Sequence, residues 1–376
     1  MKKRVEIVDG IRGFSLLGIL LANLFIFQYG IIGREFMKDD LAKWDLGGYY
    51  FTKVVIEASF IPIFTFLFGY SLIKLVNSIK KRQEKTRWVL IRRAIGLLIL
   101  GTLHAQFIWD GDILTFYGGF LFVLLFFIYR KPKTLFIWAG ILFVGIGASL
   151  FGQTIDLYDS NKIGAYVQHE ADVYSTGTYG DVMDFRNNEE IPVSEEVNFR
   201  QFLTVVGAFL MYMPLFLVGM ACAKLRFFES PEREMPIYRK LTSLIIVGIV
   251  LKVLGEFDTK YADFFTTVGA PILSFGYIAA FAWLYHTKMA QPLKDGFGAV
   301  GKLSLTNYLM QSVICTLVFY GYGLGLYEKM GVTIGLLFGL VVYIVQLLLS
   351  QWYLRHFSRG PVEKVLRMWT NFSWKG

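Results

Sequence analysis

The feature that most constrains this chain is a series of ten apolar segments, each about as long as a helix that crosses a lipid bilayer. Such a helix needs about 20 consecutive, mostly apolar residues. The segments lie at residues 11–32, 52–76, 89–109, 112–129, 134–152, 202–223, 238–256, 264–286, 303–325 and 332–354. No stretch alternates in polarity as the strands of a membrane β-barrel do. We therefore expect an all-α, polytopic membrane protein with about ten transmembrane helices.

The composition agrees with this class. Of the 376 residues, 55% are hydrophobic and only 18% are charged, whereas a soluble domain carries about 25% charged residues. The two cysteines, Cys222 and Cys315, fall in separate apolar segments, which excludes a disulfide scaffold. The composition also argues against a disordered chain and against an ordinary soluble enzyme.

Basic side chains collect in alternate connections between the apolar segments. Clusters of Lys and Arg occur at residues 2–4, 80–93, 130–133, 224–240 and 355–367. The long connection 153–200 instead holds ten acidic side chains and three basic ones. Because Lys and Arg favour the cytoplasmic side of a membrane, we expect both termini to be cytoplasmic and residues 153–200 to form one large outer loop.

The formal net charge of +9 then reflects topology, and we expect membrane lipids and no nucleic acid as partners. The pattern divides the chain into a first five-helix half (1–152), an acidic extracytoplasmic loop (153–200) and a second five-helix half with a cytoplasmic tail (201–376). Short cytoplasmic connections of this kind fit the bacterial cytoplasmic (inner) membrane.

Four ionisable residues fall near the outer ends of the segments. Ionisable groups inside a bilayer are costly and by default mark function. Glu57 and His104 each lie six residues from the outer end of a segment, so we expect them at similar depth, beside Asp110 and Asp112. A carboxylate that fixes the tautomer of an imidazole makes it a plausible general base. These four residues are candidate catalytic groups; alternatively, His104 only hydrogen-bonds a neighbouring helix.

Arginines mark the inner ends of two segments. Arg92 and Arg93 share a segment with His104, and Arg93 lies about 16 Å from His104 along a helix. Asp9 and Arg12 are three residues apart in the first segment, so they share a helix face and can pair. The arginines could hold an anionic cofactor beneath a base. The simpler interpretation is a positive-inside signal with an interfacial ion pair.

Other polar features leave two interpretations open. Asn307 and Gln311 are four residues apart and share a helix face, which suits either helix–helix hydrogen bonding or ligand binding. Pro62, Pro214 and Pro271 are expected to kink or interrupt their segments. The remaining histidines show no metal-ligand spacing, so no metal is expected.

Several motifs match a known family. They are Val8-Asp9-Gly10-Ile11-Arg12-Gly13-Phe14, Phe64-Thr65-Phe66-Leu67-Phe68-Gly69-Tyr70, Leu103-His104 with Gly111-Asp112-Ile113-Leu114-Thr115-Phe116-Tyr117, Gly301-Lys302-Leu303-Ser304-Leu305-Thr306-Asn307-Tyr308-Leu309-Met310-Gln311-Ser312, Gly360-Pro361-Val362-Glu363-Lys364-Val365-Leu366-Arg367, and Gly177-Thr178-Tyr179-Gly180 leading to Arg186. In these stretches, the sequence resembles the YeiB-like family of bacterial multi-pass membrane proteins, a family of unknown function. The match covers nearly the whole chain in order, since the stretches are spread between residues 8 and 367.

That family is in turn similar to a wider group of transmembrane acyltransferases, which includes the lysosomal acetyltransferase of heparan glucosamine. Such enzymes take an acyl group from a cytosolic thioester and deliver it to an acceptor on the other face. Their Asp-x-x-Arg-Gly opening matches Asp9, Arg12 and Gly13, and an arginine followed by a histidine in polysaccharide acylators resembles Arg93 and His104. The first segment carries Asn23 where those acylators carry a histidine, whereas the heparan-type branch also has asparagine there.

The resemblance implies transfer of an acyl group, typically acetyl, to an acceptor at the outer face. The donor would be acetyl-CoA or another acyl-CoA, held by Arg12, Arg92 and Arg93. The acceptor would be a small molecule or a surface glycan, and the candidate residues for binding it are Asn23, Tyr179, Arg186, Asn307 and Gln311.

Two other functional classes stay open. A transporter or exporter of a small anionic or lipidic molecule would suit ten segments divided five and five, as in an inverted repeat, although the halves show no sequence similarity. A non-catalytic membrane scaffold or sensor would use the acidic outer loop. The sequence leaves the oligomeric state open, with a homodimer among the choices.

Overall fold

The structure is a computed structural model that describes residues 5–152, 158–159, 161–193, 207, 210–257 and 259–372. Within these residues the chain is helical, and its one β-bridge joins Tyr158 to Val193. The all-α prediction is confirmed for this part of the chain. Parts of the expected outer loop and the start of the expected segment 202–223 lie outside the described residues.

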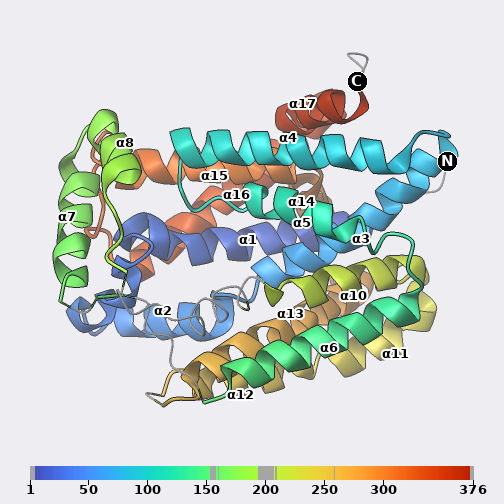
Figure 1. Cartoon of the computed structure of the whole chain (residues 1–376), viewed down its shortest axis with the longest axis horizontal. Coiled ribbons are helices and arrows are strands. Elements are labelled where there is room, and N and C mark those ends of the chain that lie inside the picture. Colours follow the sequence, from blue (N-terminus) through green and yellow to red (C-terminus); the bar gives the residue numbers. More distant parts are fainter. Residues whose placement is uncertain are drawn as a thin grey trace.

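Figure 1 shows the helices as a bundle whose members run mostly along the long axis of the molecule. Three short elements are η1 (Gly33–Glu35), η2 (Met37–Asp40) and η3 (Thr52–Ile56). The α-helices are α1 (Glu6–Tyr29), α2 (Asp45–Phe51), α3 (Ile61–Lys81), α4 (Thr86–Phe107), α5 (Leu114–Leu124), α6 (Pro132–Leu150), α7 (Ile163–Thr176), α8 (Tyr179–Asn188), α10 (Met213–Lys224), α11 (Pro231–Leu241), α12 (Leu244–Leu254), α13 (Ala262–Thr287), α14 (Gln291–Lys302), α15 (Ser304–Phe319), α16 (Val332–His356) and α17 (Pro361–Asn371).

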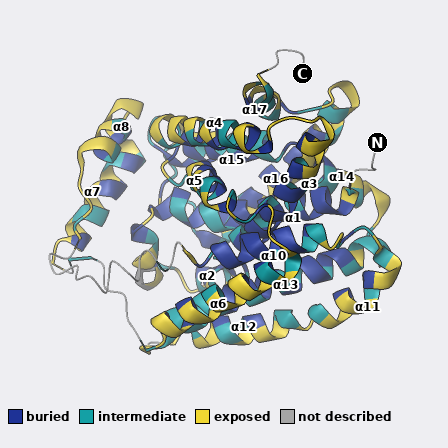
Figure 2. Ribbon diagram, turned by 45° about the vertical axis from the view of Figure 1, so that its right-hand side comes forward, coloured by how far each residue is buried: buried dark blue, intermediate teal, exposed yellow. Residues whose placement is uncertain are grey.

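Six helical stretches in the described residues are long and apolar enough to cross a membrane: α1, Asp45–Lys81, α4, α6, α13 and α16. Three shorter apolar helices, α5, α10 and α15, coincide with further expected segments. The outward faces of α6, α12 and α16 expose large apolar side chains, among them Val144, Ile246 and Leu348, and Figure 2 shows such exposed outer faces around a buried centre. Contiguous apolar surface of this extent is typical of contact with lipid.

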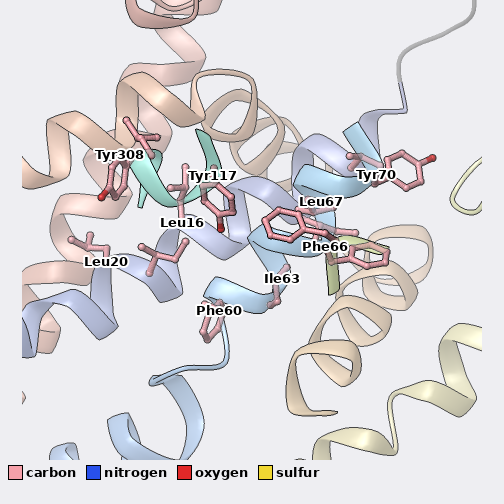
Figure 3. Close-up of a cluster of buried hydrophobic side chains, with 14 of the residues drawn as sticks. Leu16, Leu20, Phe60, Ile63, Phe66, Leu67, Tyr70, Tyr117 and Tyr308 are labelled. Atoms are coloured by element: carbon pink, nitrogen blue, oxygen red, sulfur yellow. The ribbon is translucent and has the colours of Figure 1, made fainter. Parts of the chain in front are cut away.

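Helix α1 runs through the centre of the bundle (Figure 1) and packs against α3, α13, α14, α15 and α16. It buries Ile11, Leu16 and Leu20. Figure 3 shows Leu16 and Leu20 with Ile63 and Phe66 of α3 in a cluster rich in aromatic rings. The core therefore joins helices from both halves of the sequence.

The second expected segment is a broken helix: the interruption expected at Pro62 is present, but it includes four non-helical residues, 57–60, that the sequence does not predict. Helix α2 continues into the π-helical turn η3, the chain leaves helical geometry at residues 57–60 with Ala58 at φ 57°, and α3 begins at Ile61 beside Pro62. Backbone groups freed inside a membrane must find partners in the protein. Side chains from distant helices supply the hydrogen bonds to these backbone groups.

Lys252 of α12 donates to the carbonyl oxygen of Glu57 and to the Ser59 hydroxyl, and Lys252 is 1% exposed. The Ser274 hydroxyl donates to the carbonyl of Ser59, and the Tyr277 hydroxyl donates to the carbonyl of Val55 over 2.8 Å. Lys252 is thus a buried cation that stabilises the break in the second segment.

Glycines allow α3 and α10 to cross with their backbones in contact. A side chain on Gly69 would meet the backbone of Phe216, and a side chain on Gly219 would meet the backbone of Phe66. Small residues at such crossings let helix backbones approach closely, which is how membrane helices gain packing energy.

We expect Gly219→Val to destabilise this crossing. The added side chain must displace the backbone of α3, and overpacking of this kind costs about 2 kcal/mol. The matched control is Gly140→Val, since Gly140 in α6 has open space around it. Thermal unfolding in detergent should show a melting temperature several degrees lower for Gly219→Val alone. Equal melting temperatures for the two variants would contradict the packing argument.

Two helices of the 153–200 connection, α7 and α8, lie across the end of the bundle opposite to the two termini (Figure 1). Helix α8 starts with a capping box, in which the Thr178 hydroxyl accepts from the backbone N–H of Asp181 and the Asp181 carboxylate accepts from the Thr178 N–H. Helix α8 contacts the carboxyl end of α4, where the candidate site lies.

Candidate functional site

The candidate site lies at the carboxyl end of α4. This helix buries one face through Leu90, Ala94, Leu97, Gly101 and His104, a spacing of three and four residues that keeps them on one side. The chain then turns back through residues 108–113 into α5. Gly101 permits this return, because a side chain there would meet Asp112 and Thr115.

His104 and Asp112 form a buried pair. The Nδ1 atom of His104 lies 2.9 Å from Oδ1 of Asp112, and His104 is 2% exposed. The other carboxylate oxygen of Asp112 accepts the backbone N–H of Thr115 over 2.7 Å at the start of α5. An ionised carboxylate can only accept, so with Asp112 ionised and the imidazole neutral, Nδ1 carries the hydrogen and Nε2 presents its lone pair. Nε2 is buried and has no hydrogen-bond partner among the described residues.

Aromatic side chains fix the turn around this pair. The Tyr308 hydroxyl of α15 accepts the N–H of Ile113 over 3.2 Å and lies 3.3 Å from the Gly111 carbonyl oxygen, to which it donates. The Tyr308 and His104 ring centroids are 5.3 Å apart. Trp109 stacks on Phe27 with centroids 4.1 Å apart, and the Trp109 indole N–H is buried without a partner in the described chain. The ring centroids of Trp109 and His104 are 6.4 Å apart, so the unpartnered indole N–H and the unpartnered Nε2 belong to neighbouring rings.

Helix α8 closes the carboxyl end of α4. The Arg186 guanidinium donates to the carbonyl oxygens of Ala105, Gln106 and Ile108, and the Tyr179 hydroxyl donates to the Phe107 carbonyl over 2.7 Å. These carbonyls are among those that a helix leaves unpaired at its end. The structure therefore uses Tyr179 and Arg186, which the sequence suggests as acceptor-binding residues, to cap the helix that carries His104.

The four expected catalytic residues do not all meet. Asp110 follows Trp109 in the turn and is exposed, whereas Asp112 is the carboxylate that holds His104. Glu57 pairs elsewhere, with Arg34 and Lys53 at 3.2 Å each. The expected placement of Glu57 level with His104 assumed a continuous helix, and the break at residues 57–60 sends its side chain into this ion cluster instead.

The arginines expected at the inner end also separate. Arg12 pairs with Asp9 at 3.1 Å, as its spacing predicts, and donates to the Ser71 hydroxyl over 2.7 Å. Arg93 is half-buried, lies close enough to Arg12 for their charges to interact, and has no acidic partner among the described residues. Arg92 faces the C-terminal segment, where its guanidinium lies 4.6 Å from the centroid of the Phe372 ring.

Asn307 and Gln311 hydrogen-bond between helices. Asn307 donates to Ser350 over 3.0 Å, Gln311 donates to Gln346 over 2.8 Å, and Gln346 returns a bond to the Asn307 carbonyl over 3.1 Å. This network joins α15 to α16 and favours the structural interpretation for both residues.

Asn23 is half-buried on α1, and its amide has no hydrogen-bond partner in the described residues. It lies one turn from Phe27, whose ring stacks on Trp109. Among the expected acceptor-binding residues, Asn23 therefore differs from the others in having a side-chain amide without a hydrogen-bond partner in the described residues.

Sequence reasoning passes over Trp109, Tyr308 and Lys252 as functional residues. Trp109 stands five residues after His104, and Tyr308 stands inside one of the motifs that carry the family resemblance, and these positions are the signals that could have found them. Lys252 stands alone in an apolar segment, and a lone intramembrane cation is such a signal too. The described residues contain no group of three or more His, Cys, Asp or Glu side chains that could hold a metal ion.

Comparison with known proteins places the chain among relatives of unknown function. The family model described as a protein of unknown function (DUF418) matches residues 222–373. The uncharacterised protein YxaH of Bacillus subtilis (strain 168) is 33% identical over 99% of this chain and 96% of its own length. The uncharacterised protein YeiB of Escherichia coli (strain K12) is 25% identical over 98% and 97%, respectively.

An uncharacterised 39.9 kDa protein encoded in the amylase 3′ region of Bacillus acidopullulyticus is 26% identical over 98% of this chain and 94% of its own length. The similarity thus extends from end to end, well beyond the 222–373 match. The chain belongs to the YeiB-like, DUF418 family of proteins of unknown function.

Proposed function

We propose that this protein is a membrane acyltransferase in which His104, oriented by Asp112, is the general base. The observation that carries the proposal is the buried His104–Asp112 pair with an unpartnered Nε2. A buried polar atom without a partner costs about 1–3 kcal/mol, and a substrate hydroxyl or amine would satisfy it. The Trp109 indole N–H, on the ring next to His104, is a second hydrogen-bonding group without a partner in the described residues. Asn23 of α1, one turn from Phe27, stays a candidate acceptor-binding residue.

The chemistry follows from the lone pair on Nε2. Nε2 takes the proton of an acceptor hydroxyl or amine as the acceptor atom attacks the thioester carbonyl. The carbon–sulfur bond breaks, and the proton passes from Nε2 to the leaving thiolate. Asp112 keeps the hydrogen on Nδ1 and stabilises the imidazolium that forms in between.

The acyl donor would be acetyl-CoA or another acyl-CoA, bound from the opposite end of α4. Arg93 and His104 are eleven residues apart, about three helical turns, so they lie on one side of α4 about 16 Å apart. A half-buried guanidinium with no acidic partner among the described residues favours an anionic ligand. Arg12 stands beside Arg93. Arg92 is the weakest of the three candidates, because Phe372 covers it.

We further propose ten crossings of the bacterial inner membrane with both termini in the cytoplasm. This topology puts Arg93 on the donor side and the His104 site, under α7 and α8, on the outer side. A surface glycan or a small molecule could then reach the site as acceptor. Single cysteines placed in the 80–87 and 161–190 connections test this topology through their accessibility to a membrane-impermeant label. Labelling of both cysteines from the same side of the membrane would refute the topology.

Release of free CoA thiol tests the enzymatic proposal directly. Purified protein in proteoliposomes is given acetyl-CoA on the side of the termini and a panel of sugars and amines on the other side. Thiol release that depends on an acceptor, together with acetylated product in the acceptor compartment, is the expected result. An absence of both from protein shown to be folded would count against acyl transfer.

Transport is the second candidate, and the broken second helix favours it. Discontinuous helices with charged groups at the break are a feature of many transporters, and here Glu57, Lys53, Arg34 and Lys252 gather at the break. Uptake of a labelled anion into proteoliposomes without any acyl donor would support this function. Acceptor-dependent thiol release without such uptake would exclude it.

A further inference from the structure

A second candidate site lies at the end of the bundle that carries both termini, far along α1 from the turn at Trp109. A cavity of about 450 Å³ opens there where α1 begins, α13 and α16 end and α14 packs between them. Cavities of this size hold small ligands. The charged and aromatic side chains that line it are Glu6, Tyr285, Lys294, Asp295, Lys302 and Arg355.

The lining of this cavity carries one more cation than acid, and two of its cations have no acidic partner in the described part of the chain. Lys302 and Arg355 have no acidic partner within salt-bridge distance among the described residues, and Lys294 lies 5.2 Å from the centroid of the Tyr285 ring. Of the two acids, Asp295 already accepts the Gln291 amide over 2.8 Å. Three cations from two helices therefore face one cavity with two carboxylates beside it.

The geometry explains why these cations stay together. Helix α14 lies against α1 because Gly13 and Gly301 let the two backbones touch, with Gly301 against Asp9 and Gly13 against Phe297. The Gln351 amide of α16 donates to the Pro292 carbonyl over 3.2 Å at the start of α14. The helices that carry Lys302 and Arg355 are thus fixed relative to each other, so the two charges face the cavity without a flexible loop between them.

We propose that this cavity binds the phosphate group of a phosphate ester. A phosphate offers several acceptor oxygens, which suits lysine ammonium groups together with the fork of an arginine. Glu6 and Asp295 would accept hydrogen bonds from a hydroxyl or amine elsewhere on the ligand. Basic cavities between helices at a membrane surface bind lipid head groups. A phospholipid head group and a soluble phosphate ester share this chemistry. The proposal does not depend on acyl transfer.

Thermal stabilisation of the full-length protein in detergent separates the two sources. One arm titrates dioleoyl phosphatidylglycerol into the micelles, with dioleoyl phosphatidylcholine for comparison, and the other titrates inorganic pyrophosphate. We expect one arm to raise the melting temperature with a saturable dependence. Lys302→Gln/Arg355→Gln should raise the apparent dissociation constant in that arm about tenfold or more.

The control is Lys85→Gln/Lys364→Gln, which removes the same charge from exposed positions that do not line the cavity. Both double variants should melt near the temperature of the wild type without ligand. Stabilisation by the lipid alone assigns the site to a head group, and stabilisation by pyrophosphate alone assigns it to a soluble phosphate ester. No response in either arm, or equal responses of the two double variants, would overturn the proposal.

Discussion

Replacing His104 by alanine is expected to lower the rate of acyl transfer by about a thousandfold while the protein stays folded. A positioned general base contributes about 10²- to 10⁴-fold to a rate, and in the described residues no other imidazole contacts Asp112. The matched control is His169→Ala, because His169 of α7 lies at the same end of the bundle but is exposed, with its Nδ1 atom 3.7 Å from Oε1 of Glu189. The measurement is acceptor-dependent release of CoA thiol.

Asp112→Asn tests the pair itself. An asparagine amide can donate to Nδ1, which would place the hydrogen on Nε2 and remove the lone pair that accepts the proton. We expect a loss comparable to that of His104→Ala, and the double variant should lose little more than either single variant because the two residues act as a unit. Wild-type rates in Asp112→Asn would exclude the tautomer argument, and wild-type rates in His104→Ala would exclude the general base.

The sequence places Asp112 near His104 but offers Asp110 and Glu57 equally as the carboxylate that orients it. His104 and Asp112 are eight residues apart across a tight turn, so local geometry alone brings them together. Glu57 fails because its position depends on a helix break at residues 57–60, and the groups that stabilise the break, Lys252 and Ser274, come from about 200 residues further along the chain. Pro62 predicts an interruption of this segment, but no local pattern shows which groups stabilise it or where the Glu57 side chain then lies.

Arg92 and Arg93 also show that distant parts of the chain decide where a side chain lies. Arg92 and Arg93 carry the same charge at the same depth, yet they differ by about 100° around the helix axis. One lies beside Arg12 and the other against Phe372. The direction of each side chain depends on where α17 packs, and α17 lies about 270 residues away in sequence. The sequence could therefore place the cations at one end of α4 without showing which of them faces the core.

The packing of α7 against the bundle is expected to depend on pH through Glu170. This residue of α7 is 5% exposed, its Oε2 atom has no hydrogen-bond partner in the described chain, and its carboxylate packs against Gly30 at the end of α1. Burial, reinforced by the negative charges of Asp110 and Glu328, raises the pKa of Glu170 from 4.5 to about 8. No described cation forms a salt bridge with it, so the docked helix favours the neutral acid.

The sign of the pH effect follows from this raised pKa. Below about pH 4.5 the carboxyl is protonated whether α7 is docked or released, so docking carries no penalty from Glu170. Between about 4.5 and 8 the released helix loses the proton and the docked helix keeps it, so docking weakens as the pH rises. Above about 8 both forms are ionised and the penalty is constant, at up to about 5 kcal/mol.

Limited proteolysis of α7 can measure this dependence. Raising the pH from about 5.5 to about 7.5 should increase the opening of α7 by up to about a hundredfold in the wild type, relative to Glu170→Gln at each pH. The control, Glu189→Gln, removes a more exposed carboxylate of the same loop and should keep the wild-type slope. The rate of cleavage in the wild type is divided by the rate in Glu170→Gln at each pH, which cancels the pH dependence of the protease and of His169. If this ratio does not change with pH, Glu170 is already ionised when α7 is docked.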